Sequence, residues 1–198
     1  MSTLKDLKPL SPSAFFELKA KIPKAEKKKQ FKKGLLPNAQ GLTGEGKLIS
    51  LSVLWSPVGL YFKMESKLSL ESGDTLELFI DTRDVKTSNV ITKFCHHFSF
   101  DLEEELGAEI TRFRGDDSHV LADSSLISVK TAVSRSSYVS EIALAKDILY
   151  GYEPLEFKRL GLTYRYKKKN GESQHFNLSS NDFNFDKHPA LWASMELA

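Results

Sequence analysis

Three side chains suited to binding or catalysis stand at alternating positions of one apolar stretch. A period of two over 74–81 predicts a β-strand on which Glu77, Phe79 and Asp81 share one face, opposite a row of leucine and isoleucine. Carboxylates on such a face accept hydrogen bonds from hydroxyl groups, and the ring between them offers an apolar surface. The pattern therefore indicates a face that binds a polar ligand.

A second alternating stretch, 91–100, brings histidine to the same place. If it pairs beside the first strand, His97 lies over the acidic face, while a row of aromatic residues faces the other way. Together with Arg83, which follows the first strand, Glu77, Asp81 and His97 would form a patch able to hydrogen-bond hydroxyl groups. The alternative is a solvated sheet face whose charges pair across strands.

The two carboxylates also suggest a hydrolase. Glu77 and Asp81 share one face of the expected strand, and paired carboxylates can supply the acid and base of a glycoside hydrolase. The chain has no Gly-x-Ser-x-Gly stretch, phosphate-binding loop or His-Glu-x-x-His stretch. We therefore expect no catalytic residues, and we keep a glycoside hydrolase only as a further alternative.

Metal-ligating groups occur at Cys95, His96 and His97, near Asp81 and Asp84. Adjacent strand residues point to opposite faces, so the two histidines cannot easily share an ion. His96 falls among phenylalanines and is expected to be a hydrogen-bonded core residue. We expect no resident metal and no cofactor. A surface calcium ion stays an open alternative, although no dense Asp/Asn loop specifies one.

Short strands must position these residues. A helical turn is expected at 145–150, closed by Gly151, and Asn170-Gly171 indicates a hairpin. The pattern predicts an all-β fold, a jelly-roll-like antiparallel β-sandwich with at most one short helix. The expected strands share apolar alternation and flanking turn residues, and they cover 15–23, 48–55, 58–65, 74–81, 91–100, 127–133, 138–144, 157–166, 174–178 and 193–197.

Length and composition fit one domain over 1–198, with a strand or arm at 1–34 and the core at 35–198. The tract 19–33 holds eight lysines and one acid, typical of a solvated loop or strand edge. A net charge of +2 gives no argument for nucleic acid. One cysteine excludes an internal disulfide, and neither a secretory signal nor a membrane span is visible, so we expect a cytoplasmic protein without a membrane partner.

Three stretches, 53–62, 74–84 and 189–197, together resemble the family 9 carbohydrate-binding modules, relatives of the DOMON ligand-binding sandwiches. They look like that family's Trp-turn-Leu-Tyr hairpin, its central Asp-x-x-Glu-x-Phe-Ile-Asp strand and its closing strand. Arg83-Asp84 and the stretch 94–98 look closer still to a bacterial branch of family-9-like proteins. The similarity spans roughly 48–197 and implies a sandwich that binds a saccharide or another polyhydroxylated ligand.

Sugar-binding members of the family clamp a sugar ring between two tryptophans. Glu71 stands at the position that resembles the first, and 186–188 at the second, so the resemblance implies that the usual clamp is missing. Trp55 is expected in the core, and Trp192 in the core or at its rim.

The resulting hypothesis is a non-catalytic ligand-binding module, with a protein-interaction or scaffold domain that has lost sugar binding as the alternative. The first hypothesis has a saccharide partner, the alternative a protein partner, and neither involves nucleic acid. The expected binding residues are Glu77, Phe79, Asp81, Arg83, His97 and Trp192.

Overall fold

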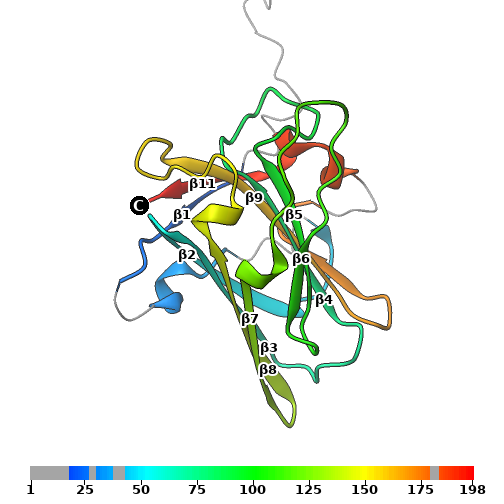
Figure 1. Ribbon diagram of the computed structural model, residues 1–198. Coiled ribbons are helices and arrows are strands. Elements are labelled where there is room, and N and C mark those ends of the chain that lie inside the picture. The colour runs from blue at the N-terminus through cyan, green and yellow to red at the C-terminus, as the bar shows by residue number, and fades with distance from the viewer. Residues whose placement is uncertain (1–17, 27–29, 38–42, 179–182) are drawn as a thin grey trace, which may run out of the picture.

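Strand pairing divides the chain into two sheets (Figure 1). The computed structural model describes residues 18–26, 30–37, 43–178 and 183–198. In sheet order, the seven-stranded sheet consists of β1 (Lys19–Ile22), β11 (Ala193–Leu197), β9 (Arg159–Lys167), β4 (Thr75–Asp81), β5 (Cys95–Asp101) and β6 (Leu106–Glu109), with β10 (Ser173–His175) paired to β9. The four-stranded sheet consists of β2 (Ile49–Ser56), β3 (Gly59–Ser66), β8 (Ser137–Ala145) and β7 (Ile127–Ser134).

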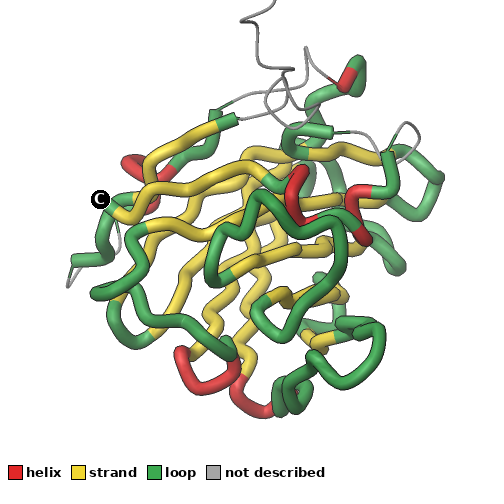
Figure 2. The backbone as a smooth tube through the Cα atoms, turned by 90° about the horizontal axis from the view of Figure 1, so that it is seen from above, coloured by secondary structure: helices red, strands yellow, loops and turns green. Residues whose placement is uncertain are grey.

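Helical structure is confined to the connections between strands (Figure 2). Within the described ranges no helix reaches seven residues, and none is long and apolar enough to cross a membrane. The single helical turn expected at 145–150 is present as η4, ahead of Gly151 at φ +78°. The 3-10 segments are η2 (Phe31–Gly34), η3 (Ser124–Leu126), η4 (Lys146–Ile148), η5 (Phe185–Lys187) and η6 (Pro189–Leu191).

The predicted β-sandwich is confirmed, but several strands differ from the expected ranges. The strand expected at 174–178 is the three-residue β10, Ser173–His175. The strand expected from 91 begins only at Cys95, because Cys95 N–H closes a turn on the Thr92 carbonyl at 2.9 Å. Strand β6 was not predicted, since its four residues carry no apolar alternation. The strand expected at 15–23 is β1, its first residues lying outside the described ranges, and it pairs with β11 in parallel rather than antiparallel fashion. Lysines 19 and 21 are exposed on this edge strand.

The core lies between the sheets. The apolar face of β4 packs there, and Phe98 and Phe100 of β5 point the same way. Trp55 is 5% exposed, as expected of a core residue, and its indole N–H donates to the Ala198 carbonyl at 3.0 Å. The fully buried members include Val53, Phe62, Met64, Leu76, Leu78, Ile80, Leu162 and Met195.

Gln174 of β10 ties the two sheets together. Its side-chain oxygen accepts the backbone N–H groups of Leu48 and Ile49 at 2.6 and 2.8 Å. Its amide donates to the Ile49 carbonyl at 3.2 Å and to the Tyr164 hydroxyl at 2.7 Å. Since Gln174 is fully buried, every polar atom of its amide group is satisfied by protein.

We expect Gln174→Ala to lower the free energy of unfolding by about 2–4 kcal/mol, because it leaves buried N–H groups without acceptors. Gln30→Ala is the matched control: the Gln30 side chain is exposed and bonds only Glu26 among the described residues, so its loss should change stability by less than about 0.5 kcal/mol. Urea unfolding measures both. Equal effects at the two positions would show that Gln174 does not hold the sheets together.

Candidate functional site

A cavity of about 500 Å³ lies on the outer face of the seven-stranded sheet. Three connections form its walls, at 89–91 between β4 and β5, at 110–114 after β6 and at 186–188 in η5 and the residue after it. In Figure 1 these connections gather at the upper right, beyond the end of β5. The sheet itself contributes Glu77 of β4, Arg165 of β9 and residues 95–97 of β5 to the lining.

Glu77 is the polar centre of this face. Its Oε2 accepts hydrogen bonds from His97 Nε2, at 3.0 Å, and from the guanidinium of Arg165. Its Oε1 accepts from Lys167 Nζ at 3.0 Å. Arg165 is the cross-strand partner of Glu77, because β4 lies between β5 and β9 in the sheet. One carboxylate therefore binds three basic groups on this face of the sheet, and two of them, His97 and Arg165, line the cavity.

The charge of Glu77 is stabilised in this setting. Burial alone would raise its pKa, but the hydrogen bonds from His97 and Arg165, the positive charge of Arg165 and the bond from Lys167 together hold the pKa at about 2. At neutral pH the carboxylate is ionised and its oxygens are occupied by donors. It can orient its basic neighbours, and it has no proton to give.

An aromatic cluster supports the polar group from beneath. Phe79 is fully buried, stacks on the His97 ring at a centroid distance of 4.1 Å, and meets the edge of Phe185 at 5.0 Å. Trp192 lines the cavity but is only 1% exposed, and its indole N–H donates to the Phe185 carbonyl at 2.7 Å. Neither predicted aromatic presents an open face. Both belong to a small second core, with Trp192 in the core rather than at its rim.

Asp81 and Arg83 do not join the patch in which they were expected. Asp81 accepts the backbone N–H groups of Arg83 and Val85 at 2.9 and 2.7 Å, so it shapes the turn after β4, and burial raises its pKa. Arg83 stacks over the Phe157 ring at 3.6 Å and donates to the Gly151 carbonyl. Neither residue lines the cavity. The predicted alternation of side chains along β4 is correct, but the strand ends at Asp81. The Asp81 side chain bonds the backbone of the following turn, and Arg83 lies in that turn, so neither side chain reaches the cavity.

Sequence reasoning missed Arg165 and the wall residues. The run Tyr164-Arg165-Tyr166-Lys167 alternates with a period of two, so its two basic residues could have been assigned to a common outer face. Their meeting with Glu77 depends on a pairing between strands far apart in the chain. The walls at 110–114 and 186–188 lie outside regular strands and show no periodicity to read.

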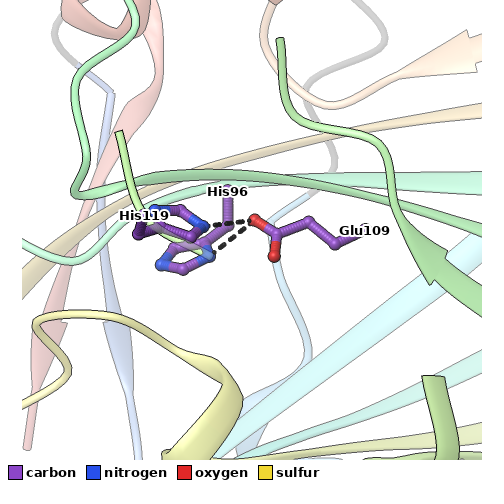
Figure 3. A group of neighbouring side chains, drawn as sticks. All are labelled: His96, Glu109 and His119. Atoms are coloured by element: carbon purple, nitrogen blue, oxygen red, sulfur yellow. Dashed lines mark hydrogen bonds and ion pairs between the residues drawn. The ribbon is translucent and has the colours of Figure 1, made fainter. Parts of the chain in front are cut away.

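A second polar cluster lies on the opposite side of β5 (Figure 3). His96 Nδ1 and His119 Nε2 each lie 2.9 Å from Oε1 of Glu109. His96 is the buried, hydrogen-bonded core histidine that the sequence indicated, and it points away from His97. Because His96 and His97 are successive residues of β5, their side chains lie on opposite faces of the sheet. Burial also raises the pKa of the Cys95 thiol to about 11, which keeps it protonated.

Comparison with known proteins gives the fold class. No protein-family model matches the sequence, and no curated protein sequence matches it either. Among solved structures the chain is similar to family 9 carbohydrate-binding modules, and it has a family-9-like β-sandwich fold.

Two of these structures come from Caldicellulosiruptor kristjanssonii. A family 9 module in complex with glucose superposes with a TM-score of 0.67 and 13% identity, over 91% of this chain and 95% of that chain. A family 9 module in complex with cellotriose gives a TM-score of 0.62 and 14% identity, over 90% and 93%. At such identities the likeness establishes the fold.

The lowered pKa of Glu77 has a consequence for stability. The folded pKa of about 2 lies below the ordinary 4.5, so the charge contributes stability that is full above about pH 5 and is lost as the pH falls toward 2. At neutral pH this contribution is about 3 kcal/mol, since one pKa unit corresponds to about 1.4 kcal/mol. We expect the stability difference between wild type and Glu77→Gln to shrink from pH 7 to pH 2.

Denaturant unfolding at a series of pH values measures this difference. Glu103→Gln, which removes an exposed carboxylate of the same type, should change the free energy of unfolding by less than about 0.5 kcal/mol throughout. A difference between wild type and Glu77→Gln that is as large at pH 2.5 as at pH 7 would contradict the assignment.

Proposed function

We propose that this chain is a non-catalytic carbohydrate-binding module whose ligand lies in the cavity on the outer face of the seven-stranded sheet. The observation that carries the proposal is the coincidence of a ligand-sized cavity with a floor of prearranged polar groups, Glu77, His97 and Arg165. Pockets of roughly 300–1,000 Å³ with a few convergent polar groups are typical small-molecule sites. The solved structures of similar fold were determined with glucose and with cellotriose.

Recognition would rest on hydrogen bonds more than on stacking. The family's tryptophan clamp, which the resemblance implied to be missing, is not needed in this proposal. Glu71 lies 3.7 Å from Lys168 Nζ and does not line the cavity, whereas Asp186, Lys187 and His188 do. With Trp192 buried, the exposed lining offers charged side chains that can donate to or accept from sugar hydroxyl groups.

The charge of the walls favours an acidic saccharide. Arg112, Arg114 and Lys187 are exposed at the cavity and form no ion pair within the part of the chain that the structure describes. Glu77 is already compensated by its three basic partners, which leaves Asp186 as the acidic wall residue. A carboxylate on the sugar would meet an excess of positive charge, and a planar guanidinium can hold it through two hydrogen bonds.

Two features support binding without catalysis. Glycoside hydrolysis requires a carboxylic acid that can protonate the leaving group, with a second carboxylate facing it. Glu77 is held ionised by basic partners, and Asp81 is bonded to backbone N–H groups outside the cavity. The two carboxylates that were expected on one strand face are therefore not available to one sugar.

Isothermal titration with glucose, cellotriose and a glucuronic acid oligomer tests the proposal. We expect saturable binding, strongest for the acidic oligomer, and a loss of about tenfold or more in affinity on Arg112→Ala, because a charge-assisted hydrogen bond contributes about 1.5–3 kcal/mol. Arg135→Ala is the matched control: Arg135 is an exposed arginine at the β7–β8 turn in the other sheet, and its loss should leave affinity unchanged.

If the folded protein binds none of these probes, nor any sugar on a glycan array, the proposal fails and a protein-interaction role takes its place. Equal losses from Arg112→Ala and Arg135→Ala would place the ligand outside the cavity. Release of sugar from the oligomer that stops in Glu77→Gln would replace binding by hydrolysis.

A further inference from the structure

The cluster of His96, Glu109 and His119 combines three groups that bind metals and buries all of them. The side chains of His96 and Glu109 are fully buried and that of His119 is 3% exposed. One ligand atom from each, His96 Nδ1, His119 Nε2 and a Glu109 carboxylate oxygen, lies within 4.8 Å of the others. Figure 3 shows both rings turned toward the same carboxylate.

The outer contacts of the cluster fix the orientation of each group. His96 Nε2 lies 3.3 Å from the Tyr150 carbonyl, and His119 Nδ1 lies 2.6 Å from the Lys93 carbonyl. The carboxylate is held on its other oxygen by the backbone N–H of Ala122, at 2.7 Å. Histidines that bind metals typically donate their second ring N–H to a carbonyl in this way, and metal-binding carboxylates are themselves hydrogen-bonded.

These contacts leave one ring nitrogen of each histidine facing Oε1 of Glu109 without a proton. A carbonyl only accepts, so the proton of a neutral imidazole belongs on the nitrogen beside it, most strictly for His119 at 2.6 Å. The other nitrogen of each ring then points a lone pair at Glu109 Oε1 from 2.9 Å. A cation placed between these three atoms would be bound by both ring nitrogens and by the carboxylate oxygen at once.

We propose that His96 Nδ1, His119 Nε2 and Glu109 Oε1 bind a divalent transition metal ion, with zinc the best match. Two imidazoles and one carboxylate form a common zinc ligand set. Bonds of about 2.0–2.1 Å in a tetrahedron hold neighbouring ligand atoms about 3.3 Å apart, so the observed 2.9 Å contacts need to open only slightly. The fourth position would take a water molecule.

The place of the cluster in the fold would let a bound ion stabilise the structure around it. His119 stacks parallel to Tyr150 at 5.7 Å and meets Phe113 edge-on at 4.7 Å, which closes the cluster with aromatic rings. His96 belongs to β5 and Glu109 to β6, whereas His119 lies in the long connection between β6 and η3. A bound ion would fasten that connection to the sheet. The same connection carries Thr111–Arg114, a wall of the outer cavity, so the metal would hold that wall in place.

Metal analysis of the full chain, purified from zinc-supplemented medium and dialysed, tests the proposal. We expect about one zinc per chain, and a melting temperature that falls by about 5–10 °C when a strong chelator removes it. His119→Ala should lose the metal. His175→Ala is the matched control, because His175 is also a buried histidine paired with a glutamate, Glu45 at 2.6 Å, and it should keep the full equivalent.

If His119→Ala fails to fold, the wild-type protein from which the chelator has removed the metal tests the proposal instead. Uptake of one cobalt(II) with the intense visible bands of tetrahedral coordination supports the site. A wild-type protein that holds no metal, takes up no cobalt and melts alike with and without chelator overturns it, as does a folded His119→Ala that keeps its zinc. These readouts involve no sugar, so they stand or fall separately from carbohydrate binding.

Discussion

The pairing of β4 with strands on both sides is the constraint on which the site depends. Side chains of a strand alternate, so the register that sends Leu78 and Ile80 into the core sends Glu77 and Phe79 to the outer face. The same register sets Arg165 opposite Glu77 on one side and His97 opposite Phe79 on the other. A shift of one residue in either pairing would bury Glu77 between the sheets and expose leucine at the cavity floor.

Two buried carboxylates on opposite faces of this sheet are satisfied in different ways. Glu77 is surrounded by three basic side chains, whose charges and donors account for its low pKa. Glu109 accepts hydrogen bonds from a threonine hydroxyl and a backbone N–H, and its Oε1 faces one ring nitrogen of each of two histidines. Since His96 and His97 are neighbours on β5, one short strand supplies a histidine to each carboxylate, and the sheet keeps the two groups apart.

Much of the fold was readable from the sequence, because alternation and turn residues are local signals. The hairpin between β2 and β3, the Asn170-Gly171 turn and the two faces of β4 all followed from neighbouring residues. The site was readable only in part. Glu77 and His97 line the cavity as strand pairing suggested, but Arg165 reaches it through a long-range register, and the partners of His96 come from segments without periodicity.

The parallel pairing of β1 with β11 has a consequence for the order of events in folding. Nearly the whole chain separates Lys19 from Ser194, its partner in the register, so β1 cannot take its place until β11 has been synthesised. The hairpins β2–β3 and β7–β8 of the four-stranded sheet can form earlier, because the two strands of each hairpin are adjacent in sequence. During translation the lysine-bearing strand therefore stays unpaired the longest, and its charges protect the growing chain from pairing with other edges.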